Sequence, residues 1–140
     1  MPRQQVETYL GNVNVKKDGV QQDWTEEEIV EYQKCFDDPI YFTQTYVKIV
    51  SLDEGLVPFS LYPYQNKMFG HFNDNRFSIV LACRQSGKSI SVCAYLLWYV
   101  LFNPEKTVAI LANKGQVARE MLARVTLMLE NIPFFLQPGC

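Results

Sequence analysis

The sequence predicts an α/β fold in which a parallel sheet is flanked by helices. From residue 77 onward the expected order is strand, loop, helix, strand, helix. The two expected strands, 77–82 and 107–112, are apolar on both faces, which is typical of parallel strands covered by helices. Two strands make only the start of such a sheet, so we expect an incomplete one, preceded by a small helical and hairpin lead-in.

Capping signals place the first helices. Residues 1–23 are polar and are expected to form a flexible, extended arm. Thr25 and Glu28 form a capping box, so a helix is expected directly after Thr25. Asp38 is expected to cap a second helix that has Pro39 at its first position. The lead-in subdomain is expected to span residues 24–57.

The main domain is expected to begin at residue 58. The lead-in ends, and the main domain starts, within a predicted hairpin formed by the apolar runs 47–52 and 56–61. Further helices are expected at 63–72, 88–102 and 116–130. Residues 58–140 are therefore interpreted as one α/β domain.

Composition narrows the classes of function. Apolar residues make up 48% of the 140 residues and charged residues 20%, as in globular proteins, and no apolar run is long enough for a membrane helix. One histidine and four cysteines without a CxxC pair argue against a zinc site. Residues 1–57 carry five Lys and Arg against eleven Asp and Glu, whereas residues 58–140 carry eight against four. An anionic ligand is therefore expected in the second part, although a mild imbalance also fits a solvated surface.

One motif carries chemistry. Residues 82–89, ACRQSGKS, have the spacing of a phosphate-binding loop, with Ala82 in place of the first glycine. The motif lies between an expected strand and an expected helix, which is the context that separates it from a chance GKS. The sequence therefore predicts a P-loop NTPase that binds ATP with Mg²⁺.

Each loop position has an expected role. Backbone N–H groups of Gln85, Ser86, Gly87, Lys88 and Ser89 can surround an anion at a helix N-terminus. The glycine allows close approach, the lysine reaches the β- and γ-phosphates, and the Ser89 hydroxyl is offered to Mg²⁺.

Three other residues near the loop have two interpretations each. Arg84 can act on a γ-phosphate as an arginine finger in cis, or it can be a surface arginine paired with a carboxylate. Gln65 can recognise the adenine edge and Tyr64 can stack on the base. The alternative for the latter pair is an amphipathic helix with an exposed glutamine and a core tyrosine.

The segment 47–54 imitates a strand that ends in the Asp-Glu of a Walker B motif. Lys48 and Ser51 interrupt its apolar run, and it precedes the phosphate loop in the chain. A hairpin turn is the better interpretation. Since the chain has no other such segment, the Walker B aspartate and the water-activating glutamate are expected to be missing.

Several motifs in order resemble the large terminase subunit of T-even-type tailed phages. These are the loop 84–89, the segments FNPEK at 102–106 and ILANKG at 110–115, and the ending LQPG at 136–139. The upstream segment YPYQ at 62–65 is similar to the adenine-contacting segment of that family. The resemblance covers about residues 24–140.

The resemblance implies the front part of a viral DNA-packaging motor. It implies a RecA-like, helicase-related ATPase domain over residues 58–140, without its Walker B strand and without the nuclease domain. It also implies double-stranded DNA, the portal of the prohead and the small terminase subunit as partners of a ring-forming full-length protein. The implied location is the host cytoplasm and, transiently, the portal vertex of the prohead. Ser60 stands where the family can place a further glutamine, so that contact is not carried over.

Two other functions remain open from the sequence. One is the N-terminal part of a superfamily 2 helicase or translocase, which also has a glutamine segment before a phosphate loop. The other is an ATP-binding module without turnover, which would need a partner over any open sheet edge.

Overall fold

The computed structural model describes residues 8–139, and the first residues of the expected arm and Cys140 lie outside that range. Five α-helices and two short antiparallel hairpins are formed in these residues. Their order along the chain is β1 (Thr8–Tyr9), β2 (Asn12–Lys16), α1 (Glu26–Asp37), α2 (Pro39–Tyr46), β3 (Lys48–Ser51), β4 (Gly55–Pro58), α3 (Pro63–Asp74), α4 (Lys88–Phe102), α5 (Gly115–Glu130) and the 3₁₀ turn η1 (Phe134–Leu136).

The predicted helix starts are confirmed. The Thr25 side chain accepts a hydrogen bond from the Glu28 backbone N–H, and the Glu28 carboxylate accepts one from the Thr25 N–H. The Asp38 carboxylate caps α2 by accepting from the Ile40 N–H at 2.8 Å, with Pro39 in the first turn. The segment that imitates a Walker B strand is a hairpin, because β3 pairs with β4 in the register Lys48↔Pro58.

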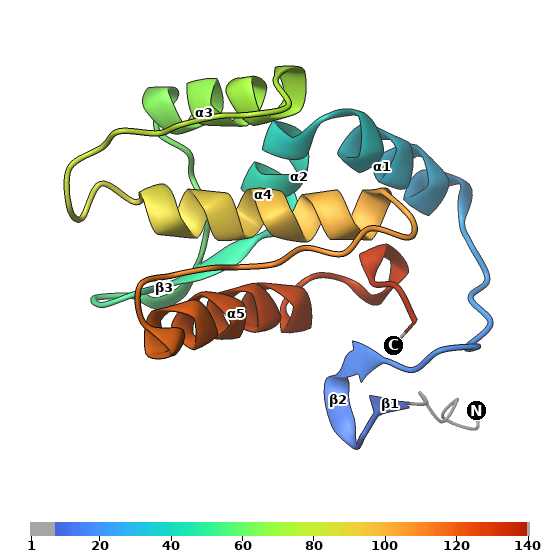
Figure 1. Ribbon diagram of the computed structural model, residues 1–140. Coiled ribbons are helices and arrows are strands. Elements are labelled where there is room, and N and C mark those ends of the chain that lie inside the picture. The colour runs from blue at the N-terminus through green and yellow to red at the C-terminus, as the bar shows by residue number, and fades with distance from the viewer. Residues whose placement is uncertain (1–7, 140) are drawn as a thin grey trace.

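The predicted parallel sheet is not formed in residues 8–139. Segments 77–82 and 107–112 are extended, but neither pairs with another strand. Both run in the direction opposite to α4 in Figure 1. Several of their apolar side chains face solvent, with Ile79 99%, Leu81 100% and Leu111 88% exposed. The apolar pattern identified the segments correctly, but a ladder also needs neighbouring backbone, which residues 8–139 do not supply.

The expected extended arm is partly structured. Residues 8–16 form the β1–β2 hairpin, and the buried side chain of Gln137 ties it to the end of the chain. The Gln137 Oε1 accepts from the Lys16 N–H at 3.0 Å, and its Nε2 donates to the Asn14 carbonyl at 2.9 Å. A long-range side-chain bridge therefore orders a segment whose own composition is polar.

The core surrounds the second half of α4. Phe102 is the centre of an aromatic cluster, with its ring 5.2 Å from Tyr32 and 5.5 Å from Phe42. Trp98 donates from Nε1 to the buried Cys35 carbonyl at 2.7 Å. These contacts fix α4 between α2 and α5, as Figure 1 shows, and leave its N-terminal end at the edge of the molecule.

None of the helices in residues 8–139 has the length and apolar character needed to cross a bilayer.

Candidate functional site

The loop before α4 has an unusual backbone. Gly87 is the N-cap of α4 and lies in the left-handed region, with φ 77°. Gln85 is also left-handed, with φ 59°, although it carries a side chain. A non-glycine residue in this region costs about 1 kcal/mol, and Leu10 and Glu105 are the other described examples. The loop is therefore a tight, strained turn immediately before the helix.

Side chains hold this turn closed. The Lys88 ammonium donates to the Cys83 carbonyl at 2.9 Å, and the Ser86 hydroxyl donates to the same carbonyl at 2.9 Å. An ammonium has three donors, so Lys88 can keep this bond while it offers others to an anion. The Lys88 ammonium is therefore already held against the loop backbone.

The first turn of α4 presents free backbone donors. The first bond across the helix start runs from the Ser91 N–H to the Gly87 carbonyl at 3.1 Å. The N–H groups before Ser91 in that turn have no intrahelical acceptor, and the helix dipole adds a partial positive charge there. Such an end favours an anion.

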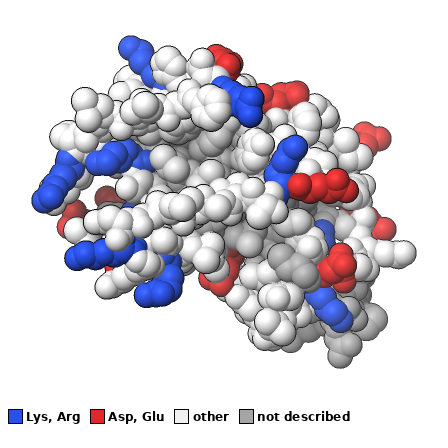
Figure 2. Space-filling view, in the orientation of Figure 1, with Lys and Arg blue, Asp and Glu red and all other residues white. Residues whose placement is uncertain are grey.

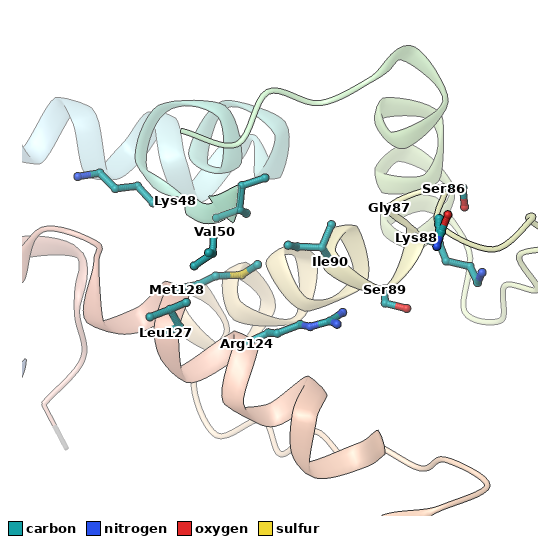
Figure 3. Close-up of a pocket in the computed structure, with 12 residues that line it drawn as sticks. Lys48, Val50, Ser86, Gly87, Lys88, Ser89, Ile90, Arg124, Leu127 and Met128 are labelled. Carbon is teal, nitrogen blue, oxygen red and sulfur yellow. The ribbon is translucent and has the colours of Figure 1, made fainter. Parts of the chain in front are cut away.

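A pocket of about 500 Å³ opens at this end of the helix. Its walls come from β3, from loop residues 85–89 and from the α5 residues Arg124, Leu127 and Met128. Figure 3 shows Ile90 and Val50 on its apolar side, and Arg124 extending from α5 toward Ser89, whose hydroxyl oxygen points away from it. Among the described residues no Asp or Glu lines it. The donor set fits a polyanion, whereas a bare divalent cation would find hydroxyls but no carboxylate.

Basic and acidic side chains gather at different ends of the molecule. Figure 2 shows Lys and Arg side chains gathered at the left margin, over the end that holds the loop and the start of α5, while acidic side chains are prominent toward α1. Within residues 8–139 no group of Asp, Glu, Cys and His forms a metal-binding cluster. The basic surface around the pocket would attract anions.

Gln65 touches the loop directly. Its side chain is only 1% exposed. Its Oε1 accepts from the Tyr62 N–H at 2.7 Å, and its Nε2 donates to the Gly87 carbonyl at 3.3 Å. The glutamine thus joins the start of α3 to the turn before α4. Recognition of adenine by this residue stays a prediction, and it would require the amide to exchange one of these bonds.

Tyr64 lies beside the loop but outside the main pocket. Its ring stacks on that of Tyr62, with centroids 6.1 Å apart. It is 39% exposed and lines a second hollow of about 440 Å³ together with Lys67 and His71. Stacking on a base stays a prediction, and the second hollow is the space available for it.

Arg84 is exposed and does not line the pocket. No ion pair joins it to a carboxylate within residues 8–139. Pairing with a surface carboxylate is therefore not formed in these residues, and the catalytic role as an arginine finger stays a prediction.

The α5 and β3 walls of the pocket were not predicted from the sequence. Arg124 lies on an amphipathic helix beside Arg119, and no local pattern distinguishes the two. Only the packing of α5 against α4 brings Arg124 to the loop. The position of Arg124 depends on tertiary packing and cannot be predicted from residue spacing.

One comparison with known proteins bears on this site. Residues 79–139 match the family described as terminase large subunit, T4likevirus-type, N-terminal. The matched segment contains the loop 82–89, α4, α5 and the C-terminal turn. The resemblance expected from the sequence is thereby confirmed over these residues, and the match gives no support to the helicase alternative.

Proposed function

We propose that this chain is the ATP-binding, N-terminal part of a phage terminase large subunit that takes part in packaging DNA. The observation that carries the proposal is the pocket at the start of α4, where Gly87, Lys88 and Ser89 meet within the segment that matches the terminase family. The family match supports the role in DNA packaging. The pocket supports a phosphate-containing ligand.

The loop residues would divide the work of binding ATP. The free N–H groups of the first turn and the Lys88 ammonium would hold phosphate oxygens. The Ser89 hydroxyl, which makes no hydrogen bond within residues 8–139, would contribute one ligand to Mg²⁺ alongside phosphate oxygens. Bound Mg²⁺ supplies charge neutralisation between phosphates. Since no described carboxylate lines the pocket, we propose for this chain the binding of ATP and not its hydrolysis.

The motor function is a broader proposal. ATP hydrolysis by the motor would need a carboxylate that these pocket walls do not provide. The full-length protein would also carry an endonuclease. Double-stranded DNA, the portal of the prohead and the small terminase subunit are the proposed partners of a ring. The proposed location is the host cytoplasm and, during packaging, the portal vertex.

Titration with a fluorescent ATP analogue tests the binding step. We expect the chain to bind it with Mg²⁺ present and Lys88→Ala to weaken binding by about tenfold or more, because a charge-assisted contact is lost. Lys106→Ala is the matched control, since Lys106 is exposed in the turn after α4. Equal affinities for the wild type and Lys88→Ala would refute the proposal.

A further inference from the structure

Arg124 reaches the phosphate-loop pocket from a different helix. It lies on α5 and lines the same pocket as residues 85–89. Figure 3 shows its side chain extending from α5 toward Ser89 in the first turn of α4. A guanidinium and the loop donors therefore converge on one space, although Lys88 and Arg124 are 36 positions apart in the chain.

The Arg124 guanidinium makes no hydrogen bond or ion pair within residues 8–139, and its charge acts only at a distance on the Cys93 thiol. Glu120, one turn earlier on α5, accepts instead from the Gln116 side chain at 3.1 Å. Arg124 thus offers a rigid fork of donors to a pocket without carboxylates.

The other basic side chains near the pocket are placed differently. Lys48 lines the pocket, but Figure 3 shows its ammonium directed away from the loop. Lys88 is folded back onto the Cys83 carbonyl at 2.9 Å. Arg84 does not line the pocket. Arg124 is therefore the arginine that faces the same space as the loop donors.

We propose that Arg124 contacts the terminal phosphate of a nucleoside triphosphate and makes the pocket prefer triphosphates to diphosphates. This inference rests on the proposed nucleotide binding. A triphosphate carries one more charged group than a diphosphate, and a guanidinium pairs with two phosphate oxygens at once. The backbone N–H groups at the start of α4 hold phosphates common to both ligands and Lys88 reaches the β- and γ-phosphates, so Arg124 adds to Lys88 at the phosphate that differs. Arg124 is a specificity residue in this role.

The test compares ATP and ADP affinities of the full chain by calorimetric titration. We expect Arg124→Ala to weaken ATP binding by about tenfold and ADP binding by less than about twofold. Arg124→Lys keeps the charge without the fork and is expected to fall between. Arg119→Ala is the matched control, because Arg119 lies on the same helix and does not line the pocket. The thermal midpoint without nucleotide is expected to be the same for all four proteins.

The outcomes separate this inference from the proposed function. If Lys88→Ala loses ATP binding while Arg124→Ala keeps the wild-type ratio of ATP to ADP affinity, the role of Arg124 is refuted and nucleotide binding stands. A loss of ATP preference in Arg84→Ala with none in Arg124→Ala would also refute it. If the wild type binds neither nucleotide, both proposals fail.

Discussion

The two ends of α4 differ in what surrounds them. At its C-terminal end, Trp98 and Phe102 are buried among aromatic rings from three helices. Trp98 also donates a hydrogen bond to the Cys35 carbonyl. At its N-terminal end, Gly87 and Lys88 border a pocket, and the extended segment before them exposes apolar side chains such as Leu81. One helix thus has an end that supplies stability and an end that is available for a ligand. Substitutions at the two ends should consequently affect different measurements.

The largest effect is expected at the packed end. Phe102→Ala should lower the free energy of unfolding by about 3–5 kcal/mol, because a ring that is 3% exposed leaves a cavity between α1, α2 and α4. Val100→Ala, on the more exposed side of the same helix, should cost well under half as much. Chemical denaturation measures both. Similar losses would mean that the cluster around Phe102 does not hold the fold together.

The next effect is expected at the open end. Gly87→Ala puts a side chain at φ 77° and a Cβ 2.9 Å from the Gln65 Nε2, so the buried Gln65 amide or the loop must shift. We expect a loss of about 1–2 kcal/mol in unfolding free energy together with the loss of ATP binding.

Gly70→Ala is the control for that substitution. Gly70 lies inside α3, and a Cβ there meets no atom within 4 Å. This change should stabilise the chain by about 0.5–1 kcal/mol and leave ATP binding as it is. Unaltered ATP affinity in Gly87→Ala would show that the turn is not part of the site.

The smallest effect concerns a carboxylate at the packed end. Glu31 accepts hydrogen bonds from the Lys34 ammonium and from the Tyr41 and Tyr46 hydroxyls, and these lower its pKa from 4.5 to about 2. A lowered pKa in the folded state stabilises the fold above pH 4.5, and this contribution disappears as the pH falls toward about 2.

Unfolding experiments over that pH range test the Glu31 contribution. Glu31→Gln should flatten the decline in stability with acid, whereas Glu27→Gln, at an exposed position one turn earlier, should follow the wild type. Parallel curves for Glu31→Gln and the wild type would show that the carboxylate does not link α1 to α2. ATP affinity at neutral pH should be equal in both variants.

The sequence predicted the elements whose signals are local. The capping residues Thr25 and Asp38 act through bonds to residues two or three positions away, and both helix starts were correct. The loop at Gly87 was located by its spacing. Strand pairing at 77–82 was wrong for residues 8–139, since a ladder depends on backbone outside the segment itself.

The pocket walls were harder to predict for the same reason. Arg124 reaches the loop through the packing of α5 on α4, and Gln137 orders the β1–β2 hairpin through bonds that span more than 100 residues. Neither residue belongs to a short motif with a known mechanism. The long-range position of a single polar side chain produces no periodic pattern in the sequence.

The most direct test of the central claim is the amide NMR spectrum of the chain during titration with Mg²⁺ and ATP. If the pocket at the start of α4 binds ATP, the N–H signals of residues 85–90 should move most, and those around Phe102 should stay in place. Shifts confined to other parts of the chain, or no shifts at saturating ATP, would contradict the account.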